Sequence, residues 1–144
     1  EHLSKKMSEL AAKKILEVLD LIEKKTFSFV KQNSKEASYA NKIDKKETKI
    51  NWNDKASKIV AKINALYPNP GAWFNLDGKR IKVIKAVEVD KKGTPGEILD
   101  EKFVIACEDK AVQIIELQKE SKNKVTVIEF LKGNKLKVGK ILNV

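Results

Sequence analysis

Two prolines near the middle of the chain constrain its fold more than any other feature. Pro68 and Pro70 lie two residues apart and directly precede Gly71. Each proline lacks a backbone N–H and disfavours helical dihedrals in the residue before it. Gly71 can adopt dihedrals closed to other residues, and the following Trp73 and Phe74 carry a large apolar surface. We therefore expect a buried aromatic corner here, with helix before it and short strands after it.

The chain before this corner indicates two helices and a linker. Apolar side chains in residues 3–25 recur at the spacing of one helix face, with charged residues opposite them, so this helix needs a partner surface. The polar stretch 26–49 loses the period and indicates an exposed linker. Ile50-Asn51-Trp52 follows as a short extended segment, and Asn53 is the expected N-cap of a helix that stops at Pro68.

The chain after the corner indicates a small β-structure. Asp77-Gly78 predicts a hairpin turn, and residues 79–89 alternate between apolar and polar with a slip at Val83-Ile84 that predicts a β-bulge. Short strands are expected at 97–100, 102–107 and 110–118, helical turns at 126–132 and a last strand at 135–142. Short, regularly spaced strands favour a small closed or partly closed β-barrel. The predicted fold class is mainly β with helices, α+β, with Trp52, Trp73, Phe74 and Phe103 in the core.

Composition argues against catalysis by this chain alone. The 144 residues suit one domain, and 42% of them are apolar, enough for one core. The single Cys107 excludes a disulfide framework and a four-thiolate zinc site, and the single His2 leaves no partner for acid–base or nucleophilic chemistry. We therefore expect no catalytic residue and no metal. No apolar run approaches the ~20 residues that span a bilayer and no leader pattern is present, so we expect no membrane partner and a reducing, cytoplasmic setting.

The remaining signal is positive charge. The formal net charge is +10, but almost every basic residue is Lys, a bias that coding composition alone produces, so local clusters carry the argument. One cluster comprises Lys79, Arg80, Lys82 and Lys85, with Arg80 and Lys82 on one strand face. A second lies in residues 119–144, where only Glu120 and Glu129 oppose seven lysines: Lys119, Lys122, Lys124, Lys132, Lys135, Lys137 and Lys140. Such lysines neutralise phosphates and favour backbone contact to a folded RNA, with plain solvation the alternative for any one of them.

The corner and its flanks resemble a known family. Ile50-Asn51-Trp52 and Ala65-Leu66-Tyr67-Pro68-Asn69-Pro70-Gly71-Ala72-Trp73 are similar to the start of the C-terminal domain of bacterial methionyl-tRNA formyltransferase. The likeness extends upstream through Ser38–Ile43, a linker motif that contains Lys42, and downstream through Pro95–Leu99, Glu116–Gln118 and Glu129–Asn134. One departure is Asn64, where the family often has Arg. The motif residues are Ile50, Trp52, Pro68, Pro70, Gly71, Ala72 and Trp73.

The resemblance implies an organisation and a function. Residues 1–34 would be the last helix of a catalytic domain whose remainder is missing, 35–49 the interdomain linker, and 50–144 an OB-like tRNA-binding domain. The parent enzyme would formylate initiator methionyl-tRNA from 10-formyltetrahydrofolate, whereas this fragment would hold no cofactor and no active site. Its partners would be initiator tRNA and the catalytic domain in cis. The expected RNA-binding residues are Lys42, Lys79, Arg80, Lys82, Lys85, Lys119, Lys122, Lys124, Lys135 and Lys137.

Two alternatives stay open at this point. Related formyltransferases that act on nucleotide sugars share similar motifs, and there the domain would be a structural cap. A free-standing nucleic-acid binding module is the other alternative, although it predicts a polar first helix rather than the wide apolar face of residues 3–25.

Overall fold

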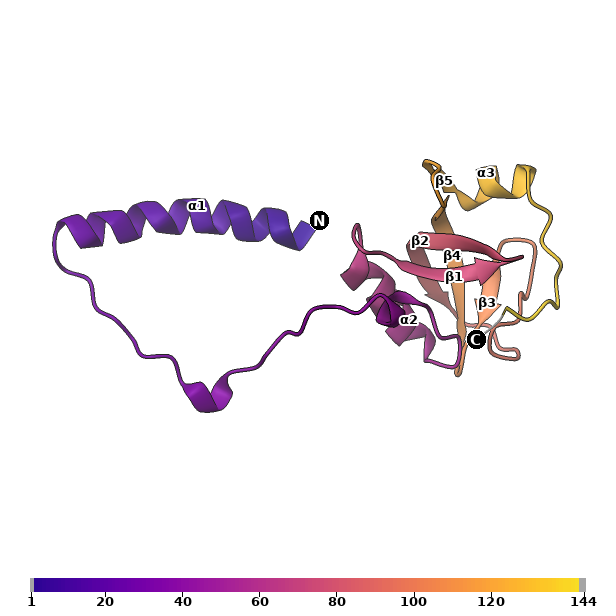
Figure 1. The fold of residues 1–144 in the computed structure, drawn as a ribbon, viewed down its shortest axis with the longest axis horizontal. Coiled ribbons are helices and arrows are strands. Elements are labelled where there is room, and N and C mark those ends of the chain that lie inside the picture. The colour runs from indigo at the N-terminus through magenta and orange to yellow at the C-terminus, as the bar shows by residue number, and fades with distance from the viewer. Residues whose placement is uncertain (1, 143–144) are drawn as a thin grey trace. The chain divides into compact units, whose positions relative to one another are not determined.

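The structure is a computed structural model that describes residues 2–142. The chain divides into two compact units, Glu1–Lys42 and Ile43–Val144, both drawn in Figure 1. The division falls inside the segment 35–49 that the sequence indicates as a linker. The functional assignment of the three predicted segments stays a prediction.

The first unit consists of one helix and an irregular tail. Helix α1 (His2–Glu23) confirms the helix predicted over 3–25, and none of its residues is buried. Its apolar side chains are exposed within this unit, with Leu3 71% and Leu16 65% accessible. A single 3₁₀ turn, η1 (Ser34–Glu36), follows, and the Asn33 side chain caps it by accepting the Lys35 N–H. Among the described residues no helix is long and apolar enough to cross a membrane.

The second unit is an antiparallel sheet with helices around it. Its sheet contains β1 (Ala72–Leu76), β2 (Lys79–Val89), β3 (Val104–Ala106), β4 (Ala111–Lys119) and β5 (Lys124–Thr126). The strand order is β1-β2-β4-β3, and β5 pairs with β4 beside this path. Figure 1 shows α2 (Ala56–Leu66) and α3 (Val127–Lys132) on different sides of the strands. The predicted α+β class is confirmed, but the sheet is not closed by strand pairing, so the barrel remains open.

Helix α2 (Ala56–Leu66) is capped from a distant part of the chain. The prediction of Asn53 as N-cap was wrong, because Lys55 holds that position and makes no side-chain cap. Instead Asp109, in the turn before β4, accepts the Ala56 N–H at 3.0 Å. The sequence could not reveal this contact because the two residues lie 53 positions apart.

The corner after α2 forms as predicted. The helix ends at Leu66, and the Gly71 N–H donates to the Leu66 carbonyl at 2.9 Å, which closes the turn. Gly71 has a φ of +82°, a conformation that favours glycine. The chain then enters β1, and the Asp77-Gly78 turn joins β1 to β2 with Leu76 opposite Lys79.

The predicted bulge in β2 is confirmed. The pairing of β2 with β4 shifts register between Val83 and Lys85, and again between Lys85 and Ala86. A bulge bends a strand and increases its twist, so one long strand serves both ends of the sheet.

Two predicted strands do not form. In 97–100, only isolated bridges occur, Glu97 to Ile141 and Ile98 to Ile105, and a turn follows in which the Asp100 carboxylate accepts the Lys102 N–H. In 135–142, the turn at Gly139, φ +80°, replaces a continuous strand. Strand β5, in contrast, was missed because it has only three residues, one of them an exposed lysine.

The core is organised by a run of aromatic rings. Phe74 lies 5.5 Å from Trp52 and 5.9 Å from Phe103 between ring centroids, and Phe103 stacks at 6.0 Å on Phe130 of α3. Trp52, Phe74 and Phe103 are fully buried, as predicted. Trp73 is only half-buried, so its predicted place in the core was wrong. Its side chain alternates with that of Phe74 and reaches the opposite face of β1.

We expect Phe74→Ala to lower the free energy of unfolding by about 3–5 kcal/mol, because it empties the centre of this aromatic run. Urea unfolding followed by tryptophan fluorescence would measure the change. Phe29→Ala is the matched control, since that ring is 92% exposed. Equal stability of the two variants would contradict the proposed core.

We also expect Asp109 to contribute to the pH dependence of stability. The Ala56 N–H that it accepts holds the pKa of the Asp109 carboxyl below its usual value. A carboxyl with a lowered folded-state pKa stabilises the fold above its unfolded pKa of about 4 and loses that contribution as pH falls through the lower value. Asp109→Asn keeps an acceptor oxygen but does not titrate, so its stability should fall less steeply between about pH 5 and pH 2.

Chemical unfolding of the wild type and Asp109→Asn at a series of pH values would measure this difference. Glu101→Gln, which removes an exposed carboxyl, is the control. Parallel pH profiles for the wild type and Asp109→Asn would rule out the effect.

Candidate nucleic-acid interface

Strand pairing brings the two basic clusters together. The start of β2 pairs with the end of β4, so Ile81 lies opposite Lys119 and Lys82 lies opposite Gln118. Strand β5 extends the pairing of Lys82 with Gln118, because Gln118 also lies opposite Lys124 on its other side. Lys82, Gln118 and Lys124 therefore form one cross-strand row, although they come from three strands.

Lys119 is the centre of this region. Its Nζ donates to Asn134 Oδ1 at 2.7 Å and lies 5.0 Å from the centroid of the Phe130 ring. It lines three neighbouring hollows. The first, about 210 Å³, also contains Arg80 and Lys82; the second contains Lys79 and Lys135; the third contains Lys122.

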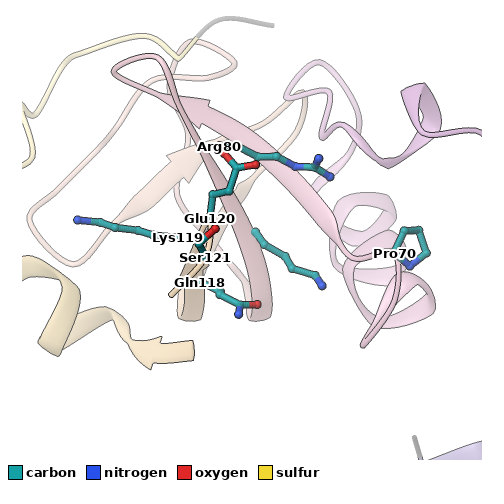
Figure 2. Close-up of a pocket in the computed structure, with 7 residues that line it drawn as sticks. Pro70, Arg80, Gln118, Lys119, Glu120 and Ser121 are labelled. Atoms are coloured by element: carbon teal, nitrogen blue, oxygen red, sulfur yellow. The ribbon is translucent and has the colours of Figure 1, made fainter. Parts of the chain in front are cut away.

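We call these six residues the basic surface: Lys79, Arg80, Lys82, Lys119, Lys122 and Lys135. Figure 2 shows the first hollow, where Arg80 extends towards the side of Pro70 and Lys119 extends the opposite way. Gln118 and Ser121 add polar groups to its lining. The polar lining of this hollow comes from β2, the end of β4 and the turn after β4, so it offers several donors to one anionic backbone.

Few acids oppose the basic surface. One acid lines each hollow, Glu120 in the first, Asp77 in the second and Glu129 in the third. Asp77 already pairs with Lys140. Glu129 accepts the Thr126 N–H in a capping box, and this hydrogen bond lowers the pKa of its carboxyl. Two of the three carboxylates are therefore engaged elsewhere.

Four of the five ion pairs of the described residues involve no residue that lines the three hollows, and the fifth, Lys140–Asp77, shares Asp77 with the second hollow. The five pairs are Lys14–Glu17, Lys58–Asp54, Lys91–Asp100, Lys110–Glu88 and Lys140–Asp77. No lysine of the basic surface belongs to any of these pairs. Cations that lack a nearby carboxylate keep their full attraction for an external polyanion, whereas paired ones do not.

Arg80 is held by an aromatic ring that the sequence analysis placed in the core. Its guanidinium carbon lies 4.5 Å from the centroid of the Trp73 ring. The Trp73 Nε1–H donates to Oγ1 of the buried Thr48 at 2.9 Å. The sequence contained a signal for this contact. The predicted Asp77-Gly78 hairpin puts Trp73 opposite Lys82, and therefore diagonal to Arg80.

The remaining predicted RNA-binding residues lie outside the hollows. Lys124 shares the cross-strand row of Lys82, and Lys85 lies opposite Glu116 in the next row. Lys137 is exposed in the irregular segment after α3. Lys42 is exposed in the first unit. A contact of these four residues with RNA stays a prediction.

The motif residues pack in the core or make hydrogen bonds that position residues of the basic surface. Ile50 and Ala72 are buried beside Trp52, and the Ile50 N–H donates to the Trp73 carbonyl at 2.7 Å. The Lys82 Nζ donates to the Pro68 carbonyl at 2.8 Å across the corner. Glycine at position 71 leaves room for the Lys82 side chain to make this hydrogen bond, because a Cβ there would overlap the end of that side chain.

Groups suited to chemistry are scarce in the described residues. None of their His, Cys, Asp and Glu side chains form a cluster of three or more that could hold a metal ion. Burial raises the pKa of the Cys107 thiol to about 12. A thiol with so high a pKa is almost fully protonated near neutral pH, so Cys107 is a poor nucleophile.

Comparison with known proteins identifies the family. The family described as formyl transferase, C-terminal domain, matches residues 42–135. The chain belongs to this family. The match includes the corner, the sheet and α3, and therefore all six residues of the basic surface.

Two curated relatives of this formyl transferase chain carry the same name. Methionyl-tRNA formyltransferase of Pelagibacter ubique is 40% identical over 146 residues, which cover 100% of the chain and 47% of the relative. The enzyme of that name from Bradyrhizobium diazoefficiens is 36% identical, covering 93% of the chain and 44% of the relative. The resemblance seen in the sequence is confirmed. The chain spans about half the length of these relatives.

Solved structures of another protein share the fold. HypX from Aquifex aeolicus matches with a TM-score of 0.64 and 29% identity over 85% of the chain and 24% of HypX. A second HypX structure, in complex with tetrahydrofolic acid, matches with a TM-score of 0.63 and 26% identity over 90% of the chain and 26% of HypX. The formyl transferase C-terminal fold therefore occurs in proteins with different names.

We expect Gly71→Ala to destabilise the chain more than Gly78→Ala. Both residues have positive φ, +82° and +75°, so each alanine costs about 1 kcal/mol in backbone strain. Only at Gly71 does the new Cβ displace Lys82 and break its hydrogen bond to Pro68, which costs up to about 1 kcal/mol more. Thermal and urea unfolding would measure both losses.

The Lys82→Ala background provides the control for this prediction. Without the lysine side chain, the two alanine substitutions should cost the same. Equal costs in the wild-type background would contradict the proposed contact between Gly71 and Lys82.

Proposed function

We propose that this chain is the tRNA-binding C-terminal portion of a methionyl-tRNA formyltransferase. The observation that carries the proposal is the basic surface, whose six cations line three hollows that share Lys119, whereas none of the ion-paired lysines lines them. The names of the curated relatives supply the class of RNA. The match to the C-terminal domain family supports the assignment to that part of the enzyme.

The proposed mechanism is electrostatic docking. Lysines release counterions from the phosphates that they neutralise, which gives affinity without dependence on base sequence. A rigid sheet that holds the body of initiator tRNA raises the concentration of the aminoacyl end at a separate active site. We propose that this site, and the 10-formyltetrahydrofolate that it uses, belong to the catalytic domain of the parent enzyme. The fragment would then be inactive by itself, and the parent would work in the cytoplasm during translation initiation.

The salt dependence of tRNA binding tests this proposal. Neutralising three cations of the basic surface, as in Lys79→Gln/Lys82→Gln/Lys119→Gln, should lower affinity for initiator tRNA at least about tenfold. The slope of log affinity against log salt should become shallower by roughly 2 to 3. Filter binding or fluorescence anisotropy at four salt concentrations would measure both.

A second triple variant, Lys58→Gln/Lys91→Gln/Lys110→Gln, is the matched control. It has the same net charge but removes ion-paired lysines, so affinity should change less than about threefold. Equal losses in the two variants, or an affinity of the wild type that is indifferent to salt, would overturn the proposal. The alternative, a formyltransferase that acts on a nucleotide sugar and uses this domain only as a structural cap, predicts no tRNA affinity at all.

A further inference from the structure

Arg80 stands apart from the other cations of the basic surface. It is the only arginine among the 30 basic residues of the chain. Its guanidinium is planar and carries five N–H donors in a fixed fork, which matches two oxygens of one phosphate. None of the ion pairs among the described residues involves it. No ion pair therefore occupies its donor edge, and the one acid that lines the same hollow, Glu120, is not paired with it.

The ring beneath Arg80 is fixed at several points. The Trp73 Nε1–H donates to Thr48 Oγ1 at 2.9 Å, and the Thr48 hydroxyl donates in turn to the Lys45 carbonyl at 2.6 Å. The Trp73 carbonyl accepts the Ile50 N–H at 2.7 Å, and the residue pairs with Lys49 in a parallel bridge. Thr48 is only 1% exposed. The backbone contacts fix the position of Trp73, and the indole cannot turn without breaking its hydrogen bond to Thr48.

A cation stacked on a fixed ring loses less freedom when it binds. Arginine carries a large rotamer entropy, and a side chain that is already oriented forfeits less of it on binding. Stacking uses the flat face of the guanidinium and leaves its edge open. The Arg80 guanidinium carbon lies over the Trp73 ring, 4.5 Å from its centroid, and Arg80 lines the same hollow as Lys82, Gln118 and Ser121.

We propose that Trp73 is a positioning residue, which holds the Arg80 guanidinium so that its free edge grips one phosphodiester group of the RNA at the first hollow. Lys82, tethered to the Pro68 carbonyl, adds a second charge at the same place. This inference rests on the proposed RNA-binding function. It assigns to the half-buried tryptophan of the motif a role beyond packing.

A double-mutant cycle in the full chain tests the coupling. Arg80→Gln should weaken initiator tRNA binding about tenfold and make the salt slope shallower by roughly 1. Trp73→Leu leaves the charge unchanged and should weaken binding about three- to fivefold in the wild-type background. The same substitution should have no further effect in the Arg80→Gln background, because its target is gone.

Conservative variants separate positioning from folding. Trp73→Phe keeps an aromatic face but loses the Thr48 hydrogen bond, so its affinity should lie between those of the wild type and Trp73→Leu. Arg80→Lys keeps the charge but not the fork, so it should lower affinity with little change in slope. If Trp73→Leu does not fold, Trp73→Phe with and without Arg80→Gln completes the same cycle.

A measurement without RNA distinguishes failure of this inference from failure of the proposed function. In the free protein, the NMR resonances of the Arg80 Hδ protons should be shifted upfield by the indole ring and should return to ordinary positions in Trp73→Leu. No tRNA binding by the wild type would overturn the proposed function. Normal Hδ positions in the wild type, or equal effects of Trp73→Leu in both backgrounds, would overturn the role of Trp73.

Discussion

The antiparallel pairing of β2 with β4 is the constraint on which the functional surface depends. It carries Ile81 opposite Lys119 and Val89 opposite Ala111, and it absorbs a bulge between these ends. Without it, the cations of the β2 start and those of the β4–β5 turn would belong to separate parts of the chain. The apolar side of the same strands, with Phe74 and Phe103 beneath it, makes the pairing stable. One sheet therefore supplies both the core and the placement of charge.

Charge placement distinguishes this domain more than net charge does. Lysines at other sites form short ion pairs, such as Lys91–Asp100 at 2.5 Å and Lys58–Asp54 at 2.6 Å. Around Lys119, the nearby carboxylates of Asp77 and Glu129 are used to pair Lys140 and to cap α3. The local field there stays positive for structural reasons that a count of residues does not show. A polyanion meets this region with the least competition from the protein's own acids.

Local patterns predicted most of the local structure, and the errors have both local and long-range causes. The helix over 3–25, the corner, the Asp77-Gly78 hairpin and the bulge all follow from the periods and turn residues of short segments. The cap of α2 by Asp109 depends on a partner far away in the chain, whereas the strand predicted over 135–142 is interrupted by the local turn at Gly139. The basic candidates were likewise found from clustering, but only strand register shows that Lys119 joins those of β2. Trp73 was misplaced because the prediction puts both Trp73 and Phe74 in the core, whereas neighbouring residues of a strand face opposite sides.

The most direct test of the account is a map of the RNA-binding surface by NMR. Titration of isotope-labelled chain with initiator tRNA should shift or broaden the backbone amide signals of residues 79–82, 118–122 and 134–135, where the cations of the basic surface are found. The amides near the ion pairs Lys91–Asp100 and Lys110–Glu88 should stay in place. Signal changes concentrated at those ion pairs, with the region around Lys119 unaffected, would contradict the account.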